Sequence, residues 1–261
     1  MHIQYINPGF QHSLDSMMLF HTHPDTPYWT DALYYFFPQV QEERMKALDA
    51  QGRKRYLAQT LQEVYDGLRE QLDEKVIAYN EHWQKHRSQI EDALSEAFQL
   101  DTRPLFNDIR AFITLNPVCP RFLQEHTFDV FYLNSHRGAL GISLHEVIHL
   151  LWFHVWNGLF QDNWNEYERP HIKWVLSEMV VESIMRDERL SSINPYFPRE
   201  NGGCVYRYFQ DMVIEGKPIL DTIEEMYRCG NIADFMRQSY QYCLQHEKQI
   251  QAHIARAEQV F

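Results

Sequence analysis

Cysteine is scarce in this sequence, and the cysteines that are present lie far apart, at Cys119, Cys204, Cys229 and Cys243. They form no CxxC pair, and small secreted domains held together by disulfides carry a much denser framework. The spacing therefore excludes a disulfide-stapled scaffold. We expect reduced thiols, most of them buried.

Basic residues are also few. The chain has 24 Lys and Arg against 36 Asp and Glu, which gives a formal net charge of −12 and an isoelectric point near 5.6. A surface with this excess of negative charge repels phosphate backbones and anionic lipid head groups. Nucleic acid is therefore not an expected partner.

Long apolar runs are missing as well. No stretch reaches the 18 or so consecutive apolar residues of a membrane span, and residues 1–25 show no basic leader followed by an apolar core. From these absences we expect a cytoplasmic protein with no membrane partner.

The chain nevertheless has ample material for a core, because 44% of its 261 residues are hydrophobic and 14% are aromatic. Apolar residues at steps of three and four between Tyr56 and Phe98 predict one long helix or two stacked ones. Short aromatic and β-branched runs at 111–115 and 128–133 predict two strands. Further helices are expected at 171–190 and beyond residue 205.

These elements predict an α+β fold that is mostly helical. We expect a mostly helical N-terminal region, residues 1–105, packed on a core formed by residues 106–261, in one continuous domain or two. In this core a small sheet would accompany the two helices that carry the polar motif residues.

The segment SLHEVIHLLWFHVW, residues 143–156, contains an HExxH pattern. On a helix, His145 and His149 project from one face one turn apart and can bind one cation at about 2.0–2.1 Å. Glu146 lies about 100° around the helix from His145, a position that suits a general base. The apolar neighbours predict a largely buried helix, in which His and Glu need partners.

Two simpler interpretations compete with a metal site. Ser143 and Glu146 form an S-x-x-E capping box, in which Glu146 would only bond back to the start of the helix. Alternatively, His145 and His149 would bond to backbone carbonyls in the core. His154, five residues after His149, falls on another side of the helix and is expected to pack or lie at the surface.

A third ligand is available in HIKWVLSEMVVESIMRDERL, residues 171–190. As a helix, this segment places Glu178 and Glu182 on one otherwise apolar stripe and turns Lys173 away from it. Buried carboxylates there need a positive partner. The alternative is that the two glutamates lie on a solvated face of the helix, where Glu182 pairs with Arg186 four positions later. Weaker ligand candidates, in or near a loop, are Glu166, Glu168 and His171.

Over about residues 141–190 the chain resembles the gluzincin group of zincin metallopeptidases. Their pattern is HExxH followed, on a second helix, by a glutamate ligand and an acidic residue four positions later. The resemblance implies that His145, His149 and Glu178 bind one zinc ion per chain, and that Glu182 accepts the outer N–H of a ligand histidine. Glu182 stands where the family usually has Asp, so both glutamates remain candidates for the third ligand.

The activity that this resemblance implies is hydrolysis of a peptide or protein substrate. Glu146 would take a proton from a zinc-bound water and pass it to the leaving amine. An extended substrate would pair with a strand edge supplied by residues 111–115 or 128–133. Candidates by composition for a donor to the developing oxyanion are Tyr206, Arg207 and Tyr208.

Two other functions remain open at this point. The same site would hydrolyse a different amide or an ester, since the fold does not determine the substrate. The chain would alternatively be an inactive zincin-like scaffold or an interaction protein that uses its long helix.

Overall fold

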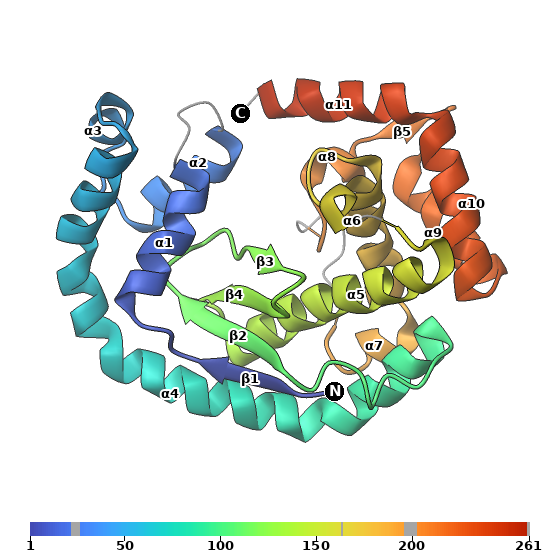
Figure 1. The fold of residues 1–261 in the computed structure, drawn as a ribbon, viewed down its shortest axis with the longest axis horizontal. Helices are drawn as coiled ribbons and strands as arrows, with labels where there is room; N and C mark the ends of the chain where they lie inside the picture. Colours follow the sequence, from blue (N-terminus) through green and yellow to red (C-terminus); the bar gives the residue numbers. More distant parts are fainter. Residues whose placement is uncertain (22–26, 163, 196–202, 260–261) are drawn as a thin grey trace. The chain divides into compact units, whose positions relative to one another are not determined.

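The computed structural model describes residues 1–21, 27–162, 164–195 and 203–259 (Figure 1). It has the expected α+β fold, which is mostly helical with a small mixed sheet. By its contacts the chain forms two compact units that interleave along the sequence. The sheet unit comprises residues 2–85 and 106–143, and the helical unit comprises Met1 and residues 86–105 and 144–259. The predicted boundary near residue 105 stays a prediction.

A four-stranded sheet forms the centre of the sheet unit, with the strand order β1-β2-β4-β3 (Figure 1). The strands are β1 (Ile3–Ile6), β2 (Ile109–Thr114), β3 (Arg121–Phe122) and β4 (Thr127–Phe131). Strands β1, β2 and β4 are parallel, with Ile3 opposite Ile109 and Arg110 opposite Thr127. Strand β3 is antiparallel to β4. The two predicted strands are confirmed as β2 and β4.

Neither predicted strand offers a free edge. The expectation that residues 111–115 or 128–133 supply an edge for an extended substrate is therefore wrong. β2 lies between β1 and β4, and the outer side of β4 is paired with β3 and the residues before it. There the backbone N–H of Asp129 donates to the Pro120 carbonyl at 2.9 Å, and that of Phe131 donates to Cys119 Sγ at 3.2 Å. The flanking segments that occupy these edges are too short to stand out in the sequence.

The helices of the N-terminal part are α1 (Phe10–His21), α2 (Pro27–Phe36), α3 (Glu42–Ala47) and α4 (Ala50–Phe98). The predicted long helix is a single element of 49 residues. It begins where the Asp49 side chain accepts the N–H of Gly52 at 2.7 Å, as an N-cap does. It ends at Gln99, whose φ of 54° leaves the helical region.

The motif lies within α5 (His136–Phe160), which starts earlier than the sequence indicated. Ser135 caps this helix, since its Oγ accepts the N–H of Gly138 at 3.1 Å. Among the described helices, α5 is the one that is long and apolar enough to cross a membrane, but 67% of its most apolar stretch is buried inside the protein. Core helices share this composition.

The helical unit continues with η1 (Trp164–Tyr167), α6 (Ile172–Met185), α7 (Glu188–Ser191), α8 (Arg207–Gln210), α9 (Ile219–Cys229), α10 (Ile232–Gln245) and α11 (Glu247–Gln259). A hairpin of β5 (Val213–Ile214) and β6 (Lys217–Pro218) precedes α9. Every residue of α6 is buried, and this helix packs against α9 and α10. The α5 residues Trp152 and Trp156 contact Phe235 and Tyr240 of α10.

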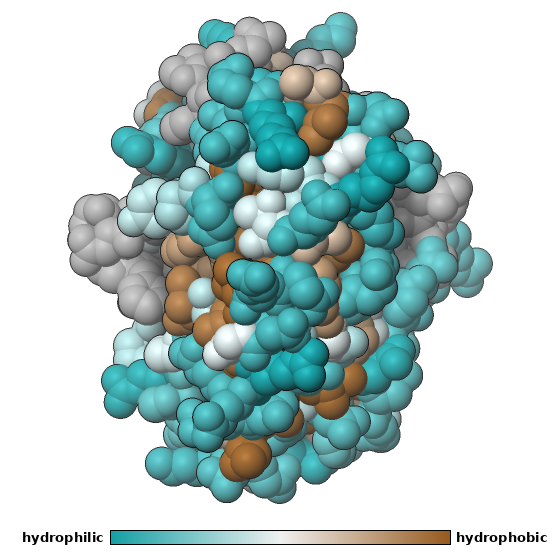
Figure 2. Space-filling model, turned by 90° about the vertical axis from the view of Figure 1, so that its left-hand side faces the viewer, coloured by the Kyte–Doolittle hydropathy of each residue, from teal (hydrophilic) through white to brown (hydrophobic). Residues whose placement is uncertain are grey.

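The four cysteines are free thiols, as the sequence predicts, but most of them are not buried. Cys243 is buried, Cys229 is exposed, and Cys119 and Cys204 are intermediate. The face shown in Figure 2 is mainly hydrophilic, with apolar residues in small groups. Isolated apolar residues are normal on the surface of a folded domain.

Candidate metal centre

The two histidines of the HExxH motif point from one face of α5, one turn apart. Their Nε2 atoms lie 3.0 Å from each other, and their ring centroids are 4.8 Å apart. The His149 side chain is fully buried, whereas that of His145 is 18% exposed. Glu146 is buried as well, with 7% of its surface exposed. The face of α5 that carries these polar groups is therefore mostly removed from solvent.

The capping-box interpretation of Ser143 and Glu146 is wrong. Ser143 lies about two turns inside α5, whose start is capped by Ser135. The Ser143 hydroxyl instead forms a 2.6 Å hydrogen bond with the hydroxyl of Tyr5, on strand β1. Glu146 is thus not needed at a helix terminus.

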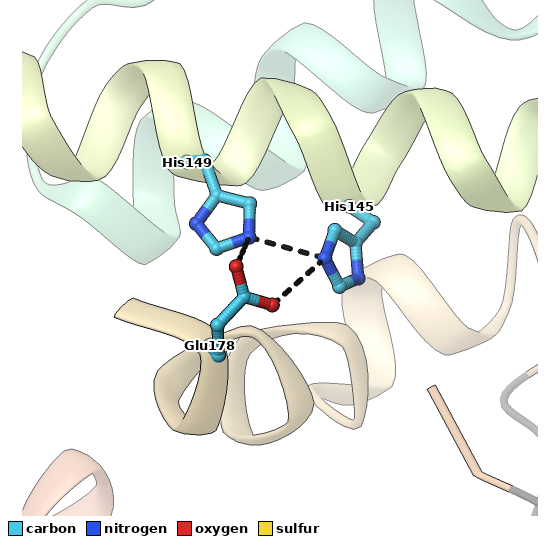
Figure 3. A group of neighbouring side chains, drawn as sticks. All are labelled: His145, His149 and Glu178. Carbon is cyan, nitrogen blue, oxygen red and sulfur yellow. Dashed lines mark hydrogen bonds and ion pairs between the residues drawn. The ribbon is translucent and has the colours of Figure 1, made fainter. Parts of the chain in front are cut away.

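The third group comes from α6, which presents Glu178 to the two imidazoles (Figure 3). Glu178 Oε1 lies 3.4 Å from His149 Nε2, and Glu178 Oε2 lies 3.6 Å from His145 Nε2. The Glu178 side chain is 5% exposed. Within the described residues, these three are the single group of His, Cys, Asp or Glu side chains whose donor atoms gather closely enough to hold a metal ion.

The size of this triangle suits one small ion. Ligand distances of about 2.0–2.1 Å and tetrahedral angles place neighbouring donor atoms about 3.3 Å apart. The two Nε2 atoms lie 3.0 Å apart, and they lie 3.4 and 3.6 Å from the two different oxygens of Glu178. With one donor atom from each residue, all three atoms lie within 4.8 Å of one another. Two imidazoles and a carboxylate are also a donor set that divalent transition metals prefer. The residues present therefore fit a zinc ion.

Glu182 lies one turn after Glu178 and does not belong to the group of donor atoms that could hold a metal ion. It is 1% exposed, and its Oε1 lies 3.8 Å from the Arg186 guanidinium, which also pairs with Glu224 at 2.8 Å. The predicted link between Glu182 and Arg186 is present, but the solvated face proposed with it is wrong because both glutamates are buried. A hydrogen bond from a ligand histidine to Glu182 stays a prediction.

The weaker ligand candidates lie outside the group. Glu166 pairs with Lys173, whereas Glu168 and His171 are exposed. His154 is exposed, which agrees with the surface position expected for it.

The three oxyanion candidates lie at α8. The Tyr206 ring stacks on that of Tyr208 with centroids 5.2 Å apart and lies 5.9 Å from Trp174, one turn before Glu178 on α6. Arg207 is exposed and lies 3.7 Å from Asp211. A role for any of the three in catalysis stays a prediction.

Sequence reasoning did not identify Lys173 as a buried residue. The helical wheel turned it away from the glutamate stripe, but it is 6% exposed and pairs with Asp162 and Glu166 in the preceding connection. The signal available in the sequence was that Asp162 and Glu166, two possible partners, lie within the eleven positions before Lys173.

Comparison with known proteins found no matching family model, no similar curated protein and no similar solved structure. The likeness to zincins therefore rests on the buried His145, His149 and Glu178 group on α5 and α6.

Proposed function

We propose that the protein is a zinc-dependent metallohydrolase that cleaves peptide bonds. The observation that carries the proposal is the buried triangle of donor atoms from His145, His149 and Glu178. Zinc enzymes commonly use two imidazoles and a carboxylate, and they keep a fourth position for water or substrate. The HExxH pattern and its likeness to the gluzincins favour a peptide substrate over other carbonyl compounds.

In this proposal His145, His149 and Glu178 hold the ion, which lowers the pKa of water and polarises a substrate carbonyl when bound. Glu146 serves as the general base. It follows His145 directly on α5 and is not one of the three ligands, so its carboxylate would lie beside an ion that they hold. There it accepts a proton from water and delivers that proton to the leaving amine nitrogen.

The first test is the metal content of the purified protein. We expect about one zinc ion per chain. The ion should be lost in H145A and in H149A and kept in E146Q. His154→Ala is the matched control, because it removes an exposed histidine from the same helix and should keep the zinc. A folded protein that contains no zinc and takes up none would refute the metal centre. Stoichiometric iron in its place would redirect the proposal to iron chemistry.

The second test is activity on a mixed peptide library, followed by mass spectrometry. Cleavage should disappear when a chelator removes the metal, and it should fall by about 10²- to 10⁴-fold in E146Q, since a general base contributes that much. H154A should cleave at the wild-type rate. A zinc-loaded protein that cleaves ester or non-peptide amide substrates but no peptide would support the alternative hydrolase. A zinc-loaded protein that cleaves none of them would support a scaffold.

A further inference from the structure

Lys173 is a buried cation on the first turn of α6. Its side chain is 7% exposed, and its Nζ forms ion pairs with the carboxylates of Asp162 and Glu166. Burial alone lowers the pKa of Lys173, but the hydrogen bonds to these two carboxylates outweigh it and raise the pKa above its usual 10.5. The ammonium group is therefore charged at neutral pH. Lysine is rarely buried without such partners.

Both carboxylates belong to the connection between the two helices of the metal centre. Asp162 follows the end of α5 by two residues, and Glu166 lies in η1. Asp162 Oδ2 also accepts the indole N–H of Trp156 at 3.1 Å, and its backbone N–H donates to the Asn157 side-chain oxygen at 3.2 Å. Lys173 is thus connected through Asp162 to the last two turns of α5.

This connection lies close to the metal centre along both helices. Lys173 precedes Glu178 by five residues, which is about 7.5 Å along the axis of α6 and about 140° around it. Trp156 follows His149 by seven residues, about 10.5 Å along α5. Because a helix moves as a stiff rod over such lengths, a shift of α6 at Lys173 displaces Glu178. Functional groups must be held to about 0.5 Å, so a small shift is sufficient to weaken coordination.

We propose that Lys173 is a positioning residue for the metal centre. By pairing with Asp162 and Glu166 it fixes the start of α6 against the end of α5, and so keeps Glu178 within coordination distance of an ion held by the two imidazoles. This role rests on the proposed metal centre. A purely structural ion pair would contribute to the stability of the fold without a separate effect on metal affinity.

The test compares the zinc affinities of metal-stripped wild-type protein, K173M and K173R, measured by competition with a chromophoric chelator. Cobalt(II) spectra of the same proteins report the coordination geometry. In K173M the carboxylates of Asp162 and Glu166 can hydrate, since their side chains are 23% and 42% exposed. We expect K173M to bind zinc about 10-fold more weakly, as loss of a supporting group outside the ligands commonly does. Its cobalt absorption bands should change, and K173R should recover most of the affinity.

Arg53→Met is the matched control. Arg53 is likewise a buried cation, 7% exposed, and it donates to the Met45 and His21 carbonyls within the sheet unit. We expect R53M to unfold at a lower temperature while its zinc affinity stays within twofold of wild type. If K173M does not fold, D162N replaces it, because the amide keeps the contact with Trp156 and weakens the ion pair. A zinc affinity at least threefold lower is expected for D162N.

The outcomes separate the two proposals. A zinc affinity of folded K173M within twofold of wild type, or an equal loss in R53M, overturns the positioning role and leaves the metal centre intact. The same holds if K173M does not fold and D162N keeps wild-type affinity. A wild-type protein that binds neither zinc nor cobalt overturns the metal centre itself, and the positioning role with it.

Discussion

Replacing each glutamate of α6 by glutamine distinguishes a metal ligand from its neighbour. Glutamine keeps the size of glutamate, but its neutral amide is a poor ligand for a cation. Glu178 lies 3.4 and 3.6 Å from the two imidazole nitrogens, whereas Glu182 lies 3.8 Å from the Arg186 guanidinium. The two substitutions remove the same charge from the same buried helix. They differ in that Glu178, and not Glu182, belongs to the group of donor atoms that could hold a metal ion.

The expected magnitude follows from the number of ligands. Structural zinc sites with four ligands bind with about 10–16 kcal/mol, or roughly 2.5–4 kcal/mol per ligand if shared evenly. At about 1.4 kcal/mol per factor of ten, E178Q should weaken zinc binding by about 10²- to 10³-fold. A residue that supports a ligand through a hydrogen bond changes affinity by about 10- to 100-fold. The loss in E182Q should therefore be smaller than the loss in E178Q.

Competition with a chelator of known affinity measures both losses directly, and thermal unfolding provides an independent check. Zinc at about 1,000 times its Kd adds about 4 kcal/mol to the free energy of unfolding. For a chain of this size the wild-type Tm should then rise by about 8–16 °C. Most of this rise should disappear in E178Q, and E182Q should keep a larger share of it. A larger loss of affinity in E182Q than in E178Q, or wild-type affinity in both, would refute the assignment of Glu178 as the third ligand.

Two further predictions concern other parts of the chain. Burial, and then the nearby charge of Arg53, lower the pKa of His21 to about 4 from its ordinary 6.5. Between pH 6.5 and 4 the unfolded chain therefore binds a proton that the folded protein does not, and stability should fall by up to about 3 kcal/mol as the pH is lowered through this range. Urea titrations at pH 7 and 4.5 should show a smaller difference in H21N than in wild type, and an equal difference would contradict the assignment. Among the thiols, burial raises the pKa of Cys243 to about 12, whereas Cys229 is exposed. A disulfide reagent should therefore modify Cys229 in the native protein and Cys243 only after unfolding, and rapid native labelling that persists in a C229S/C119S/C204S variant would contradict this order.

The ligand spacing could be predicted from the sequence because a helix fixes the relative direction of residues four apart, whatever surrounds it. The same reasoning placed Glu178 and Glu182 on one stripe of α6. It could not choose between them, because both lie on the same side and both are buried. The choice depends on the crossing of α5 and α6, which brings one carboxylate and not the other to the imidazoles.

Features that depend on distant partners were not predictable. The S-x-x-E string around Ser143 satisfies the local rule for a capping box, but Ser143 is a core residue of α5 that bonds to the hydroxyl of Tyr5, 138 positions away. The occupied edge of β2 has the same origin, since β1 pairs with β2 across more than a hundred residues. The burial of Lys173 likewise follows from the path of the connection before α6, for which the sequence has no regular period.

The two glutamates of α6 should respond differently to zinc. Glu182 has the Arg186 cation beside it, whereas Glu178 faces two imidazoles, where a bound divalent ion would add positive charge beside its carboxylate. In urea, E178Q should therefore differ from wild type more in the presence of zinc than in the presence of a chelator, because only the zinc-loaded protein uses this carboxylate to hold an ion. E182Q should be less stable than wild type under both conditions, because it removes half of an ion pair. An equal difference between E178Q and wild type with and without zinc would mean that Glu178 is held for the fold and not for a cation.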